Sequence, residues 1–161
     1  MRTVQQILAE LESLGSEKTR KTYRRHGAPD SMFGVKVGDL KKVARTIKGQ
    51  QQLAIDLYET QNIDAMYLAG SVADGSRMTR TQLDRWAKTA SWHMVAEYSV
   101  PGVAAENMHA VALANQWLRS RTESIACTGW CTYSAILATW NDDEIDFDEV
   151  TSLMDQIVIA I

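Results

Sequence analysis

Apolar residues recur at helical spacing along most of the chain, and glycine, proline or capping residues separate one apolar stripe from the next. The first stripe ends at Gly15 and consists of Val4, Ile7, Leu8, Leu11 and Leu14. Residues three and four apart share one face of an α-helix, so this spacing predicts an amphipathic helix with its apolar face buried.

The same pattern and its punctuation predict a series of further helices joined by short turns. Ser16, Thr79, Ser91 and Thr122 are suitable N-caps because their hydroxyl groups accept a hydrogen bond from the first helical turn. The expected helices are 17–26, 37–48, 51–60, 64–73, 80–90, 92–100 (stopping before Pro101), 105–119, 123–140 and 147–161.

No β-type alternation or hairpin turn interrupts this pattern, which predicts an all-α fold. The helices follow one another in pairs of about 35–45 residues, which favours a HEAT-like helical-repeat solenoid, an α–α superhelix. A compact helical bundle is the alternative. The length of 161 residues fits one domain covering residues 1–161.

Residues 33–49 combine a glycine-bearing loop with a basic amphipathic helix. Val37, Leu40, Val43, Ala44 and Ile47 fall on one face of that helix. Lys41, Lys42, Arg45 and Lys48 point elsewhere. An apolar stripe buries such a helix, and the cationic stripe is left for solvent or for an anionic partner.

The net charge of −3 conceals an uneven distribution of charge along the chain. Residues 1–50 contain eleven Lys/Arg and five Asp/Glu, whereas residues 51–161 contain six and fifteen. This asymmetry indicates a basic face that meets an anion. A dipolar surface without a partner explains it equally well.

Composition excludes several other functions. No apolar run approaches the roughly 20 residues of a membrane span, and the two cysteines, Cys127 and Cys131, favour a reducing, cytoplasmic setting. His26, His93 and His109 lack metal-ligand spacing, and no phosphate-binding glycine motif occurs. We therefore expect no metal, no cofactor and no membrane partner.

The C-terminal segment is unusually apolar for the end of a helical repeat. Its stripe consists of Leu153, Met154, Ile157, Val158 and Ile161. A terminal repeat needs a polar outer face. This pattern predicts either a chain that continues beyond residue 161 or a homo-oligomer formed through this helix.

Most of the five tryptophans fit core positions, but Trp92 stands at the start of a predicted helix beside His93. Two alternatives are open there: Trp92 is partly exposed, or, as the residues alone favour, Trp92 is a core residue and Glu97 is solvated. An indole face attracts cations, and the carboxylate of Glu97, on the same helix, attracts the same cation if both border one groove.

Three stretches of the chain resemble the bacterial DNA alkylation repair proteins of the AlkD type. They are residues 33–48, the LYET helix that follows, and the run TRTQLDRWAKTASWHMVAEYSV. The resemblance extends from about Ser16 to about Leu137. It implies a HEAT-like solenoid that holds duplex DNA in a basic concave groove. It also implies a glycosylase that excises cationic N3- and N7-alkylpurines without a metal.

Position by position, the resemblance implies catalytic roles for Glu97, Trp92 and His93 and a groove role for Tyr23. Three residues depart from the family pattern: His93 replaces a second tryptophan, Glu97 replaces an aspartate, and Cys127 is nearest to a family arginine. The expected phosphate contacts are Arg20, Arg24, Arg25, Lys36, Lys41, Lys42 and Arg45, together with Lys21.

Two other functions remain open on the sequence alone. The three departures are compatible with a non-catalytic protein that binds DNA, including branched or damaged DNA, through the same basic face. Alternatively, the chain is a helical scaffold for protein interactions, with the acidic stretch 141–150 as its contact. Salt-sensitive DNA affinity separates the first two functions from the third.

Overall fold

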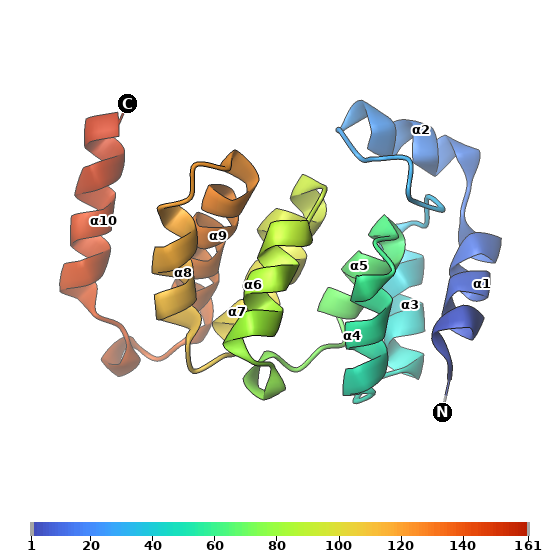
Figure 1. Cartoon of the computed structure of the whole chain (residues 1–161), viewed down its shortest axis with the longest axis horizontal. Coiled ribbons are helices and arrows are strands. Elements are labelled where there is room, and N and C mark those ends of the chain that lie inside the picture. Colours follow the sequence, from blue (N-terminus) through green and yellow to red (C-terminus); the bar gives the residue numbers. More distant parts are fainter. Residues whose placement is uncertain (1, 161) are drawn as a thin grey trace.

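The chain folds into helices that follow one another along an elongated molecule (Figure 1). The computed structural model describes residues 2–160, with side chains for residues 2–155. No strand occurs in that range, which confirms the all-α prediction. The α-helices are α1 (Val4–Leu14), α2 (Glu17–Arg25), α3 (Val37–Thr46), α4 (Gln51–Glu59), α5 (Ile63–Gly70), α6 (Arg80–Thr89), α7 (Val100–Ala105), α8 (Ala110–Leu118), α9 (Glu123–Thr139) and α10 (Phe147–Ala160).

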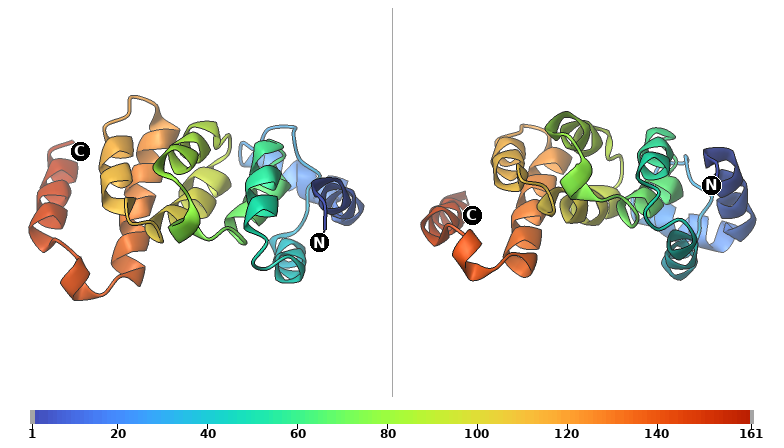
Figure 2. Two further views of the ribbon diagram at one scale, coloured as in Figure 1. Left: turned by 60° about the horizontal axis from the view of Figure 1, so that its bottom comes forward. Right: turned by 90° about the horizontal axis from the view of Figure 1, so that it is seen from below.

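The helices are arranged in two layers. Helices α4, α6 and α8 lie side by side in one layer, and their partners α5, α7 and α9 lie behind them (Figures 1 and 2). Helix α3 packs against α5 on that second side, and α2 runs crosswise over one end. The pairs begin at Gln51, Arg80 and Ala110, a shorter repeat than expected because the helices and turns are short.

Aromatic side chains join the helices of the first layer through ring packing and hydrogen bonds. The ring of Tyr58 on α4 stacks on Trp86 of α6 at a centroid distance of 3.9 Å. The Tyr58 hydroxyl donates to the Trp86 carbonyl oxygen at 2.8 Å. One helix further on, the indole nitrogen of Trp117 donates to Asp84 at 3.0 Å. Stacked, hydrogen-bonded aromatic pairs of this kind contribute stability beyond their buried area.

The expectation of buried tryptophans holds for Trp86 and Trp117, but not for Trp130, which is 36% exposed. The buried face of α9 is formed instead by its neighbours Thr128, Gly129 and Thr132. A Cβ atom at Gly129 would lie 2.7 Å from the backbone nitrogen of Leu118, so α8 and α9 approach too closely there for a larger residue. Trp130 is therefore turned toward solvent.

The helix that was expected to stop before Pro101 instead continues through it to Ala105. It contains a π-helical turn, η2 (Val95–Ser99), in which the Val100 N–H bonds to the Val95 carbonyl. Proline removes the N–H that would bond to the carbonyl four residues earlier, here that of Glu97. A π-turn spaces its hydrogen bonds more widely and accommodates this loss. The predicted helix end before Pro101 was wrong, because the spacing of apolar residues does not reveal a π-turn.

The loop before α3 is held by one buried carboxylate. Asp64, 1% exposed, accepts hydrogen bonds from the backbone N–H groups of Phe33, Gly34 and Val35 at 2.7, 2.9 and 2.9 Å. Gly34 has a φ of 78°, and a Cβ atom there would lie 2.8 Å from the backbone nitrogen of Arg20. The glycine thus permits the close approach of this loop to α2.

Helix α10 lies beside α8, where the amide nitrogen of Asn115 donates to Glu149 at 2.6 Å. Met154 is 62% exposed and Leu153 is half-buried. The other members of the predicted apolar stripe, Ile157, Val158 and Ile161, lie outside the residues whose side chains are described. Within the described range, no helix has both the length and the apolarity needed to cross a membrane.

Candidate functional site

A cavity of about 340 Å³ opens where the helix containing η2 meets the start of α9. It brings together Trp92, His93 and Glu97, the three side chains expected to be catalytic, although Glu97 is five residues from Trp92. Helix α9 contributes the opposite wall, including Cys127.

Of the two alternatives for Trp92, the core position holds: the side chain is buried, with only 8% of its surface accessible. Its indole nitrogen donates to the backbone carbonyl oxygen of His26 at 2.8 Å, and its ring lies 5.0 Å from that of Tyr23. The His93 ring meets it edge-on at the same centroid distance. The burial arises because the end of α2 covers the indole, so Trp92 joins α2 to the cavity.

Glu97 is half-buried in the π-turn and borders two cavities. On one side it shares the 340 Å³ cavity with Glu123, and on the other it shares a cavity of about 350 Å³ with Cys131. Burial, followed by the nearby charge of Glu97, raises the pKa of the Cys131 thiol. The 340 Å³ cavity has a negative character, because its described lining residues include two carboxylates and no Lys or Arg.

Glu123 and Ser124, on α9, line the same cavity as Glu97, and no pattern in the sequence singled them out. The one available signal was the predicted start of a helix at Thr122, which placed them in a first turn but not beside a segment some 26 residues earlier. Cys127 and Cys131 are half-buried free thiols. No cluster of three or more potential metal ligands occurs within the described part of the chain.

Tyr23, an expected DNA contact, is half-buried and already engaged. Its hydroxyl donates to the carbonyl oxygen of Val35 at 2.8 Å, which ties α2 to the loop before α3. Burial, reinforced by the charge of Asp64, raises the pKa of this phenol. In this structure its side chain therefore holds α2 in place.

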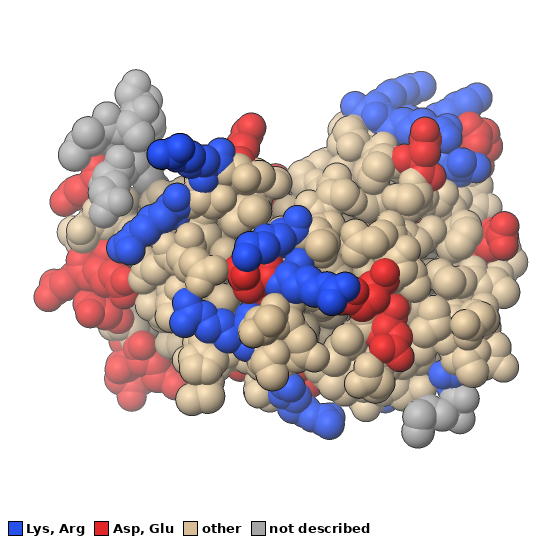
Figure 3. Space-filling model, in the orientation of Figure 1, with Lys and Arg blue, Asp and Glu red and all other residues tan. Residues whose placement is uncertain are grey.

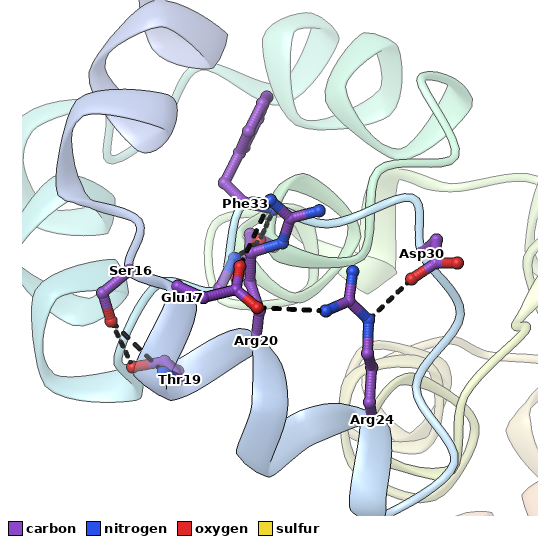
Figure 4. Close-up of polar contacts among 9 residues, drawn as sticks. Ser16, Glu17, Thr19, Arg20, Arg24, Asp30 and Phe33 are labelled. Carbon is purple, nitrogen blue, oxygen red and sulfur yellow. Dashed lines mark hydrogen bonds and ion pairs between the residues drawn. The ribbon is translucent and has the colours of Figure 1, made fainter.

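Of the expected phosphate contacts on α2, Lys21, Arg24 and Arg25 are exposed and Arg20 is half-buried. Figure 3 shows Lys and Arg gathered over this helix at one end of the molecule. Two of them are paired within the protein (Figure 4). Glu17 lies 3.8 Å from Arg20 and 3.4 Å from Arg24, and Arg24 is also 2.7 Å from Asp30. These ion pairs reduce the charge that both arginines present.

Other expected contacts keep their full charge. Arg25, Lys36, Lys41 and Arg45 are exposed and form no ion pair among the described residues, whereas Lys42 is 2.8 Å from Asp39. The hydrogen bond and charge of Lys42 lower the pKa of the Asp39 carboxyl. Of the apolar face predicted for this helix, Leu40, Val43, Ala44 and the C-cap Ile47 are buried, whereas Val37 is half-buried. The cations of α3 are therefore turned outward.

The chain is similar to known proteins over most of its length. Residues 7–158 match the family model described as DNA alkylation repair enzyme. An uncharacterized protein of Listeria innocua, Lin0241, is 31% identical over 140 residues, which cover 83% of this chain and 62% of that protein. The uncharacterized protein Lmo0209 of Listeria monocytogenes shows the same identity and coverage. The chain thus spans less than two thirds of the length of these relatives.

A solved structure is also similar, with a TM-score of 0.90 and 34% sequence identity. The match covers 97% of this chain and 66% of the other. That structure is described as belonging to a new family of proteins related to the HEAT-like repeat DNA glycosylases with affinity for branched DNA structures. The HEAT-like fold expected from the sequence is therefore confirmed. On the match over residues 7–158, the chain belongs to the DNA alkylation repair enzyme family.

Proposed function

We propose that this protein binds DNA, including branched DNA, through the cations of α2 and α3. The observation that carries the proposal is the set of exposed cations without an ion-pair partner among the described residues, Arg25, Lys36, Lys41 and Arg45. The similar structure with affinity for branched DNA supports it, since 97% of this chain aligns with that protein.

Phosphate contacts explain how such a surface works. A cation that neutralises a phosphate releases bound counterions, so affinity falls as salt rises, with a slope of roughly 0.9 per contact. The contacts fix the position and orientation of the duplex without reading its sequence. A protein that recognises the shape of DNA needs contacts of this kind.

The test is a titration of a four-way junction and a linear duplex of the same length, at several salt concentrations. We expect the double variant Lys41→Gln/Arg45→Gln to bind more weakly and to lower the salt slope by about 2, one unit per contact. The control Thr151→Glu/Ser152→Glu makes the same change in net charge on α10, far from α3. Equal slopes for wild type and the α3 variant would refute the assignment.

A second function, removal of cationic alkylpurines, is favoured by one specific feature: Glu97 and Glu123 face the same cavity as Trp92. An alkylated purine carries a positive charge, and positive charge develops on the sugar as the glycosidic bond breaks. A carboxylate aimed at that charge stabilises it electrostatically. It also positions a water molecule for attack, as the carboxylates of glycosidases do.

Release of free 7-methylguanine from methylated duplex DNA tests this second function. We expect Glu97→Gln to reduce release about 100-fold or more, the typical cost of removing one electrostatic group from a catalytic site. Glu123→Gln, on the opposite wall, is the control. An equal loss of release in both variants would indicate a general effect of negative charge, whereas a larger loss in Glu97→Gln would indicate a role specific to Glu97. Absence of release by folded wild-type protein that binds DNA would leave binding as the function.

A further inference from the structure

Every lysine and arginine after residue 50 is exposed, and these six residues cluster on or next to two neighbouring helices. Figure 3 shows Lys and Arg gathered over α6 and the adjoining end of α8, apart from those over α2. We call this group the α6–α8 patch; it consists of Arg77, Arg80, Arg85, Lys88, Arg119 and Arg121. The segment 51–161 is strongly acidic as a whole, so its few cations are concentrated rather than dispersed.

A hydrogen-bond network fixes part of this patch. Arg80 donates to the side-chain oxygen of Gln116 at 2.7 Å, and the Gln116 amide donates to Asp84 at 2.9 Å. Asp84 also accepts from Trp117 at 3.0 Å and pairs with Lys88 at 2.6 Å. The network links α6 to α8, so two cations of the patch are held in place before any partner arrives.

Asp84 stays ionised in this network. Burial alone would raise the pKa of its carboxyl, but hydrogen bonds from Lys88 and Trp117 outweigh burial, and the pKa is lowered. Of the other cations, Arg85 pairs with Glu59. Arg77, Arg119 and Arg121 have no ion-pair partner within the described residues and present their full charge to solvent.

The patch and the cations of α3 lie on different sides of the core. Helices α6 and α8 belong to the layer that faces the viewer in Figure 1, whereas α3 packs against α5 on the far side. On the face shown in Figure 3, uncharged and acidic surface separates the patch from α2. A straight duplex lying along α3 therefore leaves the patch uncovered.

We propose that the α6–α8 patch binds the phosphate backbone of a second duplex arm when the protein is bound to branched DNA. This inference rests on the proposed function, and it extends that function to a surface that neither α2 nor α3 includes. Arginine matches phosphate geometry with its planar fork of donors, and a duplex carries one negative charge per about 1.7 Å of its axis. The cations of the patch would contact backbone rather than read bases.

The test compares a four-way junction with a linear duplex, using wild type and the variant Arg119→Gln/Arg121→Gln. Neither arginine makes an ion pair or hydrogen bond from its side chain to another described residue, so the variant should retain its fold. We expect the salt slope for the junction to fall by about 2 and that for the linear duplex to stay unchanged. Between 50 and 200 mM salt, the loss of junction affinity should become about tenfold smaller.

The control Gln5→Glu/Ala9→Glu changes the net charge equally on α1, away from the patch, and should leave both slopes as in wild type. If the variant binds the junction with the wild-type slope while α3 variants lose binding, the second surface is refuted and the proposed function stands. If wild type binds neither DNA at 50 mM salt, the proposed function fails and the inference fails with it.

Discussion

The indole nitrogen of Trp92 lies 2.8 Å from the backbone carbonyl oxygen of His26 and donates a hydrogen bond to it across 66 residues of sequence. The bond joins the end of the basic helix α2 to a wall of the cavity that contains Glu97. Because the Tyr23 ring packs against the same indole, Trp92 is the point at which the cationic surface and the cavity are held together.

Replacement of Trp92 should therefore affect the position of α2 as well as the cavity. We expect Trp92→Phe to cost about 1 kcal/mol, the typical net contribution of one hydrogen bond, and Trp92→Ala to cost about 3–5 kcal/mol, as for large aromatic truncations. Chemical denaturation measures both costs. A Trp92→Phe variant as unstable as Trp92→Ala would contradict the assigned role of the indole N–H.

Amide exchange supplies an independent check on the position of α2. The backbone N–H groups of α2 should exchange faster in Trp92→Ala than in wild type, since the helix loses its contact with the cavity wall. Trp130→Ala is the matched control, because Trp130 is 36% exposed and lies on α9. Faster exchange in both variants, or in neither, would contradict the prediction.

Asp64 should be among the most sensitive positions in the chain. Asp64→Ala leaves three backbone N–H groups of the loop 33–35 without their acceptor, at about 1–3 kcal/mol for each group that water cannot reach. Asp64→Asn retains one acceptor oxygen and should cost less. Thermal unfolding measures the order of the two variants, and equal stability of Asp64→Ala and wild type would exclude this role.

Glu17 should weaken DNA binding. Glu17→Gln removes the carboxylate that pairs with both Arg20 and Arg24. Arg20 then has no ion-pair partner among the described residues and is free to contact phosphate, whereas Arg24 keeps its pair with Asp30. We expect tighter binding and a salt slope steeper by about 1. Glu12→Gln, on α1, has the same effect on net charge but frees no arginine. An equal gain in both variants would show that net charge alone is responsible.

The thiol of Cys131 provides a reporter of Glu97. Because burial and the Glu97 charge raise the pKa of this thiol above its ordinary value of 9.0, little thiolate is present at pH 8. Alkylation, measured in a Cys127→Ser background, should be slow and should rise only at high pH. Glu97→Gln should shift the rate profile to lower pH, whereas Glu123→Gln should shift it less. A pH–rate profile that Glu97→Gln leaves unchanged would show that the charge of Glu97 does not raise the pKa of the Cys131 thiol.

The helical framework was predictable because local signals agree with one another. Ser16 caps α2, and Thr79 caps α6 in a capping box with Gln82, so periodicity and chemistry marked the same boundaries. Two features were not marked by these local signals, for physical reasons. The π-turn before Pro101 has no pattern of its own, and Trp92 is buried by α2, a contact that only the tertiary fold creates.

The candidate site was predictable in part. Trp92, His93 and Glu97 do meet in one cavity, but the opposing residues of α9 are distant in sequence. The expected phosphate contacts are exposed except for Arg20, which is half-buried, and Tyr23, expected in the groove, is half-buried as well. The pair of Glu17 with Arg20 follows from their i,i+3 spacing on α2. The pair of Arg24 with Asp30 could not be foreseen, because Asp30 reaches the arginine through a turn after α2.

The π-turn η2 also changes how this cavity should be compared with those of other family members. In a regular α-helix, the residue four after a tryptophan lies nearest to it on the same face. Here the Ala96 N–H still bonds to the Trp92 carbonyl at 3.0 Å, and Ala96 and Glu97 both line the cavity. The Val100 N–H, by contrast, bonds to the Val95 carbonyl, five residues earlier, so the wider spacing shifts by one position only the residues that follow Glu97. A residue beyond the turn, such as Pro101 at the second cavity, can thus occupy the same point in space as a residue from a different column of a sequence alignment. Equivalence between relatives is a matter of superposed coordinates, not of counting residues from the tryptophan.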